Sequence, residues 1–269
     1  MTKENHNTKV SFTSSLKLLS EIFTCYLKSF FRSDLVIVLF VLGIGVATSL
    51  WLFSDNVENT NELEGIIITI SNLSSLIIFT IPFSITILSL NFHHIFSLLD
   101  NESKDTVLKH KIFFTTFFSF IRVLLLSFIT LFFIWTFTAI MWPKVFANAN
   151  LLSIFVYSIA FITFWFLFST VCLDIFPKKY LTTFTQITSI ILIISGGYII
   201  PAISFPPALN TITQILPTRA TGDVLLYNFF GTRIPGGAIV TFLEYFVVFA
   251  CLFVIVLKRC KNNRRVLFF

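Results

Sequence analysis

Six apolar stretches, each almost free of charged residues, divide this chain into segments of membrane length. A helix needs about 20 apolar residues to cross a hydrocarbon core about 30 Å thick, and it pairs every backbone amide within its own segment. The pattern therefore predicts an all-α polytopic membrane protein with six transmembrane helices. The expected spans are Leu35–Phe53, Gly65–Phe92, Ile112–Trp142, Leu151–Phe176, Leu181–Ile200 and Gly237–Leu257.

The composition argues against a water-soluble globular domain. Hydrophobic residues make up 56% of the 269 positions, and charged residues only 12%. A soluble domain keeps too much of its surface in water to hide that much apolar area. The apolar stretch after the polar N-terminus is interrupted by Lys17, Glu21 and Lys28, unlike that of a cleaved signal peptide. We therefore expect the first span to act as its own insertion signal.

Lysine and arginine residues predict the orientation of the spans, because they accumulate in cytosolic loops. The first expected loop, Ser54–Glu64, has acidic residues and no basic one, so it should lie outside. Both termini are then cytosolic, and the net charge of +6 is a topology signal rather than evidence for nucleic-acid binding. The basic residues on the expected cytosolic side are Lys3, Lys9, Lys17, Lys28, Arg32, Lys104, Lys109, Lys111, Lys178, Lys179, Lys258, Arg259, Lys261, Arg264 and Arg265.

Two segments on the expected cytosolic side have helical patterns of their own. Ser15–Arg32 carries apolar residues at helical spacing with charged residues between them, which predicts a helix lying in the membrane interface. A generic membrane anchor would show the same pattern. His93–Lys111 is short and charged, and it is either a helix that docks on a soluble partner or a solvated loop. The expected organisation is an N-terminal part at 1–33, a transmembrane domain at 34–257 and a basic tail at 258–269.

The one long external connection, Gly196–Gly237, combines prolines with apolar residues at helical spacing. Prolines break a regular helix, while apolar residues resist leaving the membrane. Short re-entrant helices that fold back into the outer leaflet satisfy both demands, provided that they are buried in protein or line a cavity. The prolines are Pro201, Pro206, Pro207, Pro217 and Pro235.

Sequence motifs for catalysis or cofactor binding are absent. The chain has no GxxxxGK[ST] phosphate loop, no HExxH zinc motif and no GxSxG nucleophile turn. The adjacent His93 and His94 have poor geometry for one metal, and the separated cysteines favour packing thiols over disulfides or metal ligands. We therefore predict no catalytic residue, cofactor or metal site. The cysteines are Cys25, Cys172, Cys251 and Cys260.

Two ionisable residues fall inside expected spans, where charge is costly. Arg122 lies about three turns from Ile112, and we expect its long side chain to snorkel to the headgroups. Glu244 lies about 10 Å beyond Gly237 at 1.5 Å per residue, so it should face protein, either as a hydrogen-bonding group between helices or as a substrate contact.

Two local patches resemble the ABC-2 type permease family. Glu102-Ser-Lys-Asp105-Thr106-Val-Leu108 is similar to the acidic, Thr and Leu pattern of that family's first cytosolic loop, although Asp105 stands where the family often has Gly. Ser195-Gly196-Gly197-Tyr198-Ile-Ile-Pro201, with Phe205-Pro206-Pro207-Ala-Leu209 and Leu216-Pro217-Thr218, is similar to its span-five and re-entrant signature.

The resemblance implies a permease subunit that pairs with a second permease subunit and rides on a cytosolic ABC ATPase in a bacterial cytoplasmic membrane. Related small permeases often export peptides, lipids or drugs. A secondary transporter or channel would need more intramembrane charge, and a membrane-embedded enzyme would need a nucleophile–base set. The residues expected to couple to the ATPase are Leu98, Leu99, Glu102, Asp105, Thr106 and Leu108. Those expected along the substrate pathway are Glu244, Gly196, Gly197, Pro206 and Pro207.

Overall fold

The computed structural model describes Thr24 and residues 61–88, 105–175, 178–198 and 205–262. This part of the chain is helical and contains no strand, which confirms the all-α prediction for it. The helices are α3 (Asn61–Leu88), α5 (Asp105–Met141), the 3-10 helix η4 (Pro143–Phe146), α6 (Leu151–Ile175), α7 (Lys178–Ser195), α8 (Pro207–Thr213), α9 (Pro217–Phe229) and α10 (Gly236–Asn262).

Among the described residues, four helices are long and apolar enough to cross a membrane: α3, α5, α6 and α10. They coincide with four of the six expected spans. The expected span Leu181–Ile200 corresponds to α7, a helix of 18 residues that is not among these four. The expected span Leu35–Phe53 lies outside the described residues, as does Ser15–Arg32 apart from Thr24, which is helical and exposed.

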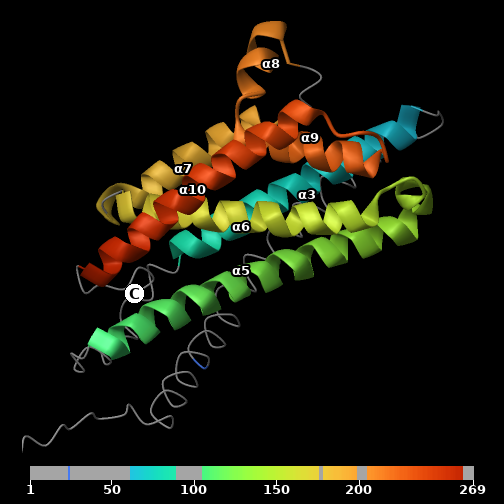
Figure 1. The fold of residues 1–269 in the computed structure, drawn as a ribbon. Helices are drawn as coiled ribbons and strands as arrows, with labels where there is room; N and C mark the ends of the chain where they lie inside the picture. Colours follow the sequence, from blue (N-terminus) through green and yellow to red (C-terminus); the bar gives the residue numbers. More distant parts are fainter. Residues whose placement is uncertain (1–23, 25–60, 89–104, 176–177, 199–204, 263–269) are drawn as a thin grey trace, which may run out of the picture.

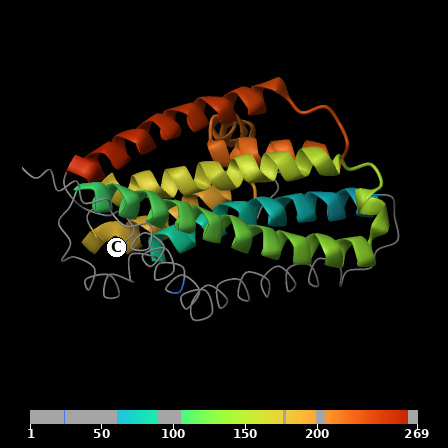
Figure 2. The same cartoon turned by 60° about the horizontal axis from the view of Figure 1, so that its bottom comes forward.

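The long helices run side by side along a common axis and alternate in direction (Figure 1). α3 packs against α5, α6 and α9, while α10 packs against α6 and α9 and lies along one edge of the bundle (Figure 2). In the most apolar stretch of α3, 72% of the residues are buried, against 11% in α10. α3 is therefore the central helix, and α10 is peripheral.

Aromatic rings fill the contact between the long helices. The rings of Phe79 in α3 and Trp165 in α6 meet edge to face with centroids 4.6 Å apart, and Phe161 meets Phe242 of α10 in the same way at 4.5 Å. Buried hydroxyl side chains such as those of Ser74 and Ser158 also occur along these helices, and small residues of this kind allow close helix packing in membranes. The indole N–H of Trp135 donates a hydrogen bond of 3.0 Å to the hydroxyl of Ser74, which joins α5 to α3.

The end of α7 is a glycine cap that brings α9 against it. Gly197 has a φ of 76°, and its N–H donates to the carbonyl of Ile194, while the N–H of Tyr198 donates to Ile193. This is the Schellman arrangement, which ends a helix at a left-handed residue. A Cβ on Gly196 would lie 3.0 Å from the Cβ of Thr218, so this glycine permits the close approach of α9. The segment therefore ends α7 and lets α9 pack closely against it.

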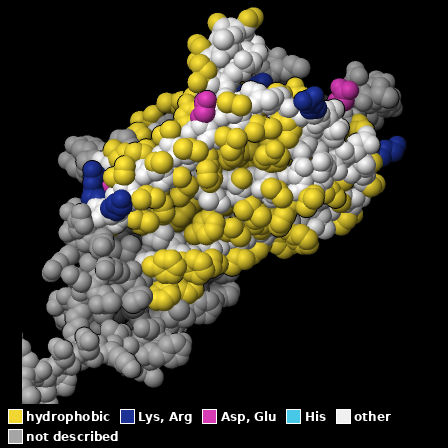
Figure 3. Space-filling model, viewed as in Figure 1, with side chains coloured by type: hydrophobic (Ala, Val, Ile, Leu, Met, Phe, Trp, Pro, Cys, Tyr) yellow, Lys and Arg dark blue, Asp and Glu magenta, His cyan; other side chains and the backbone are white. Residues whose placement is uncertain are grey.

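Apolar side chains cover the outer surface between the two ends of the bundle. On the face in Figure 3, the charged side chains gather mainly at the two ends, with an acidic and a basic group near the base of α8. Large exposed hydrophobic residues occur along α5, α6, α7 and α10. A surface of this kind and size is stable in lipid rather than in water, which supports a membrane protein.

Arg122 does not reach that surface. It is only 8% exposed and lies within the bundle rather than snorkelling to the headgroups as the sequence led us to expect. Burial inside a helical bundle allows an arginine to use its donors on protein groups instead of lipid phosphates.

The alternating directions bring the start of α5, the start of α7 and the ends of α6 and α10 to one end of the bundle (Figure 1). We call this the basic end, because it holds Lys178 and Lys179 at the start of α7 and Lys258 and Arg259 near the end of α10. Arg259 also donates to the carboxylate of Asp174 over 2.9 Å and so ties α10 to the end of α6.

Candidate functional site

A groove of about 820 Å³ opens between α8, α9 and the first half of α10. α8, which forms part of one wall of the groove, projects from the side of the bundle (Figure 1). The groove is lined by Thr211, Gln214, Ile215, Arg219, Ala220, Asp223, Tyr227, Pro235, Gly237, Ala238, Thr241, Glu244, Tyr245, Val248 and Phe249. Its volume is within the usual range of about 300–1,000 Å³ for small-molecule sites.

Local sequence features determine where α8 and α9, which form two walls of the groove, begin. Pro207 and Pro217 stand at the first positions of α8 and α9, where a proline needs no backbone donor. The hydroxyl of Tyr198 donates a hydrogen bond of 2.8 Å to the carbonyl of Thr218, which anchors the first turn of α9 to the chain after α7. The small buried residues of α9 then let this helix lie against α3, α6 and α10.

Arg219 and Asp223 form an ion pair along α9. The Nε of Arg219 donates to the carboxylate of Asp223 over 2.9 Å, and both side chains are largely buried, at 13% and 22% exposed. Burial raises the pKa of the Asp223 carboxyl, and the charge and hydrogen bond of Arg219 oppose that rise. The Nη1 of Arg219 is buried and has no hydrogen-bond partner among the described residues. It is a donor available to an occupant of the groove or to water.

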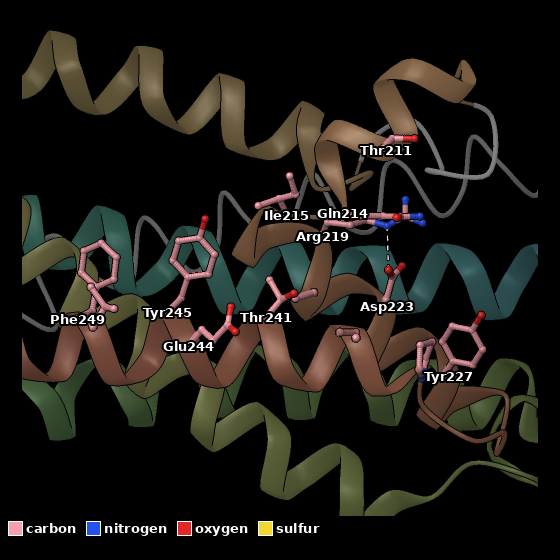
Figure 4. Close-up of a pocket in the computed structure, with 15 residues that line it drawn as sticks. Thr211, Gln214, Ile215, Arg219, Asp223, Tyr227, Thr241, Glu244, Tyr245 and Phe249 are labelled. Atoms are coloured by element: carbon pink, nitrogen blue, oxygen red, sulfur yellow. Dashed lines mark hydrogen bonds and ion pairs between the residues drawn. The ribbon is translucent and has the colours of Figure 1, made fainter.

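Glu244 contributes the other charge. Figure 4 shows its carboxylate beside Thr241 on α10, with the Arg219–Asp223 pair farther along the groove. Glu244 is exposed and has no hydrogen-bond or ion-pair partner among the described residues. Tyr227, Tyr245 and Phe249 bring aromatic rings to the same walls. The groove therefore combines one uncompensated acid with aromatic and aliphatic surface.

Of the five sequence-predicted pathway residues, one lines the groove. Glu244 lines the groove, facing helices of the Gly196–Gly237 segment that we expected to cap it. Gly196 and Gly197 instead form the cap of α7, while Pro206 and Pro207 begin α8, and none of these four lines the groove.

The residues expected to couple to an ATPase are only partly described. Asp105, Thr106 and Leu108 fall in the first two turns of α5, before the apolar stretch that begins at Phe113. Leu98, Leu99 and Glu102 lie outside the described residues.

Sequence reasoning missed the other polar groups of the groove. Arg219 and Asp223 are four residues apart, a spacing that predicts an ion pair on a helix. Nothing in the sequence marked Tyr227 and Tyr245 as groove residues, because amphipathic aromatic residues are common near membrane interfaces.

Among the residues that the structure describes, no cluster of three His, Cys, Asp or Glu side chains could hold a metal ion. In comparisons with known proteins, no protein-family model matches the chain, and no curated protein or solved structure matches it significantly.

Proposed function

We propose that this chain is the permease subunit of an ATP-binding-cassette exporter of the ABC-2 type and moves an amphipathic or hydrophobic substrate. The main observation behind the proposal is the groove, since it places a carboxylate without a partner among the described residues on the exposed side of a helix of spanning length. A polar site of this kind in an apolar bundle is expensive, and such sites mark substrate pathways. In this proposal α7 and the 35–53 segment complete six spans, and α8 and α9 are re-entrant helices.

The form of α5 supports a cytosolic partner. Its first eight residues, Asp105–Ile112, precede the apolar stretch and extend the helix by about 12 Å at 1.5 Å per residue. This extension lies at the basic end, which the proposal places in the cytosol because lysine and arginine accumulate there. Because the sequence has no phosphate loop, ATP hydrolysis would take place on a separate ABC ATPase, with a second permease subunit completing the pathway.

The docking of the ATPase is tested by co-purification. The chain is extracted from its native membranes with a mild detergent, and co-purifying proteins are identified by mass spectrometry. We expect an ATPase with a phosphate loop to appear, and to be lost when Leu98, Leu99 and Leu108 are all changed to Asp. The matched control changes Leu209 of α8, which is exposed and distant from the basic end, to Asp. Equal recovery of the ATPase with both variants would exclude this docking segment.

A secondary transporter or channel is the alternative function. Proteoliposomes that contain the chain alone separate the two, because a secondary transporter moves its substrate with an ion gradient and without ATP. Gradient-driven transport in the absence of any ATPase would replace the proposed function with this alternative.

A further inference from the structure

The charges of the groove do not balance. Three of its lining residues are charged, and two of them, Arg219 and Asp223, neutralise each other over 2.9 Å. Glu244 remains as an acid with no cationic partner among the described residues. When Glu244 is ionised, the groove therefore carries one net negative charge, which a cation would complement.

The surroundings of Glu244 indicate where that cation comes from. Val240, Leu243, Val247 and Val248 surround it on α10, and they are 55%, 52%, 59% and 53% exposed. An exposed apolar face on a helix of spanning length is turned toward lipid rather than water. A charged carboxylate within such a face is costly, so the acid there either holds a proton or pairs with a cation. The occupant must therefore itself dissolve in the membrane.

The walls of the groove match the body of such a molecule. Ile215 and Val248 provide aliphatic surface, and the rings of Tyr245 and Phe249 flank the same space (Figure 4). Aromatic faces attract cations as well as apolar groups, particularly where water is scarce. A volume of about 820 Å³ suits one small amphiphile or one side chain of a longer peptide, but not a folded polypeptide.

We propose that the groove binds amphipathic monocations, molecules with one ammonium or guanidinium head on an apolar body, which enter sideways from the bilayer. Glu244 pairs with the head, Tyr245 covers it, and the apolar body lies against Ile215, Val248 and Phe249. This inference names the substrate class of the proposed export function and rests on that function only for transport. Binding itself is a property of this chain and needs no ATPase.

Photolabelling in nanodiscs of phosphatidylcholine tests the binding. Two probes carry the same twelve-carbon chain with a diazirine, one ending in trimethylammonium and the other in a hydroxyl group. We expect the ammonium probe to label peptides covering residues 235–249 about tenfold more than the hydroxyl probe, equivalent to ~1.4 kcal/mol. Glu244→Gln keeps the size and hydrogen bonding of the side chain but removes its charge, so labelling by the ammonium probe should fall to the level of the hydroxyl probe.

Matched variants separate this site from general attraction of cations. Glu64→Gln removes an exposed acid at the start of α3, outside the groove, and should leave the tenfold preference intact. Glu244→Ala serves as a second variant if the Gln variant inserts poorly. Equal labelling of the parent by both probes, or a preference that survives both changes at Glu244, would overturn the proposal.

Two further outcomes are distinguishable. If a second copy of the chain covers the groove, neither probe labels it and a cysteine at Val247 cross-links two copies, which also overturns the proposal. If the ammonium preference is present but no ATPase co-purifies, the binding site stands and the proposed export function falls.

Discussion

The contact between the end of α9 and the α5–α6 connection depends on a single residue, Gly231. Its φ of 66° lies in the left-handed region, where side chains are strained. A Cβ at this position would also collide with the backbone carbonyl oxygen of Asn148. The neighbouring contact, in which the N–H of Asn150 donates to the carbonyl of Asn228 over 3.0 Å, holds the same two segments together.

Changing Gly231 to Ala should therefore destabilise the fold. The left-handed conformation alone costs roughly 1–2 kcal/mol for a residue with a Cβ, and the displacement of Asn148 adds to it. We expect a lower midpoint of thermal unfolding in detergent, measured by fluorescence-detected size exclusion. Gly65→Ala is the control, since nothing lies within 4 Å of its added Cβ. Equal midpoints for the two variants would contradict this reading of Gly231.

The two intramembrane charges show what a residue pattern can and cannot predict. Arg122 and Glu244 both stand alone in apolar stretches of the sequence. In the structure, Arg122 is buried within the bundle and Glu244 is exposed on α10. Tertiary packing decides between these outcomes, because a long apolar stretch does not reveal which side of its helix faces neighbouring helices.

At the scale of elements, α9 keeps its position through its joint with the end of α7. Tyr198 is 5% exposed, and its hydroxyl is the donor that links it to Thr218. Because the carbonyl of Thr218 lies in the first turn of α9, this bond fixes the wall of the groove that carries Arg219 and Asp223.

Tyr198→Phe removes that hydroxyl but keeps the aromatic ring. It should therefore weaken the attachment of α9 without creating a cavity in the core. A hydrogen bond of this type contributes about 1 kcal/mol to stability. We expect a small loss of stability together with faster hydrogen exchange of the amides in Pro217–Phe229. Tyr157→Phe on α6 is the matched control, and unchanged exchange of α9 in the Tyr198 variant would show that the bond does not hold this helix.

The long helices could be predicted from the sequence, and the groove could not. The expected spans Ile112–Trp142 and Leu151–Phe176 end within one residue of α5 and α6, because Pro143 interrupts the first apolar stretch and Pro177 the second. α5 begins at Asp105, seven residues before the expected span and within the His93–Lys111 segment that the sequence left open as a helix or a loop. The groove depends on how α8 and α9 pack against α10, which prolines and periodicity leave open.

On the scale of the whole molecule, the bundle has two chemically different ends. The basic end carries Lys258 and Arg259, while the opposite end holds η4 and the connection into α10. The groove occupies the half of α10 nearer the opposite end. If the basic end is cytosolic, the groove therefore lies in the outer half of the membrane, where an exporter would release its substrate.

The orientation of the two ends is open to a direct measurement. Single cysteines replace Lys144 in η4 and Lys258 near the end of α10, both of which are exposed, in a background whose native cysteines are changed to alanine. A membrane-impermeant maleimide added to intact cells should label the cysteine at 144 and not the one at 258, because positively charged segments remain in the cytosol. Permeabilised cells should show both labelled, which establishes that each cysteine is reactive. The reverse pattern in intact cells would place the groove in the cytosolic half, where it could collect a substrate but not release one outside.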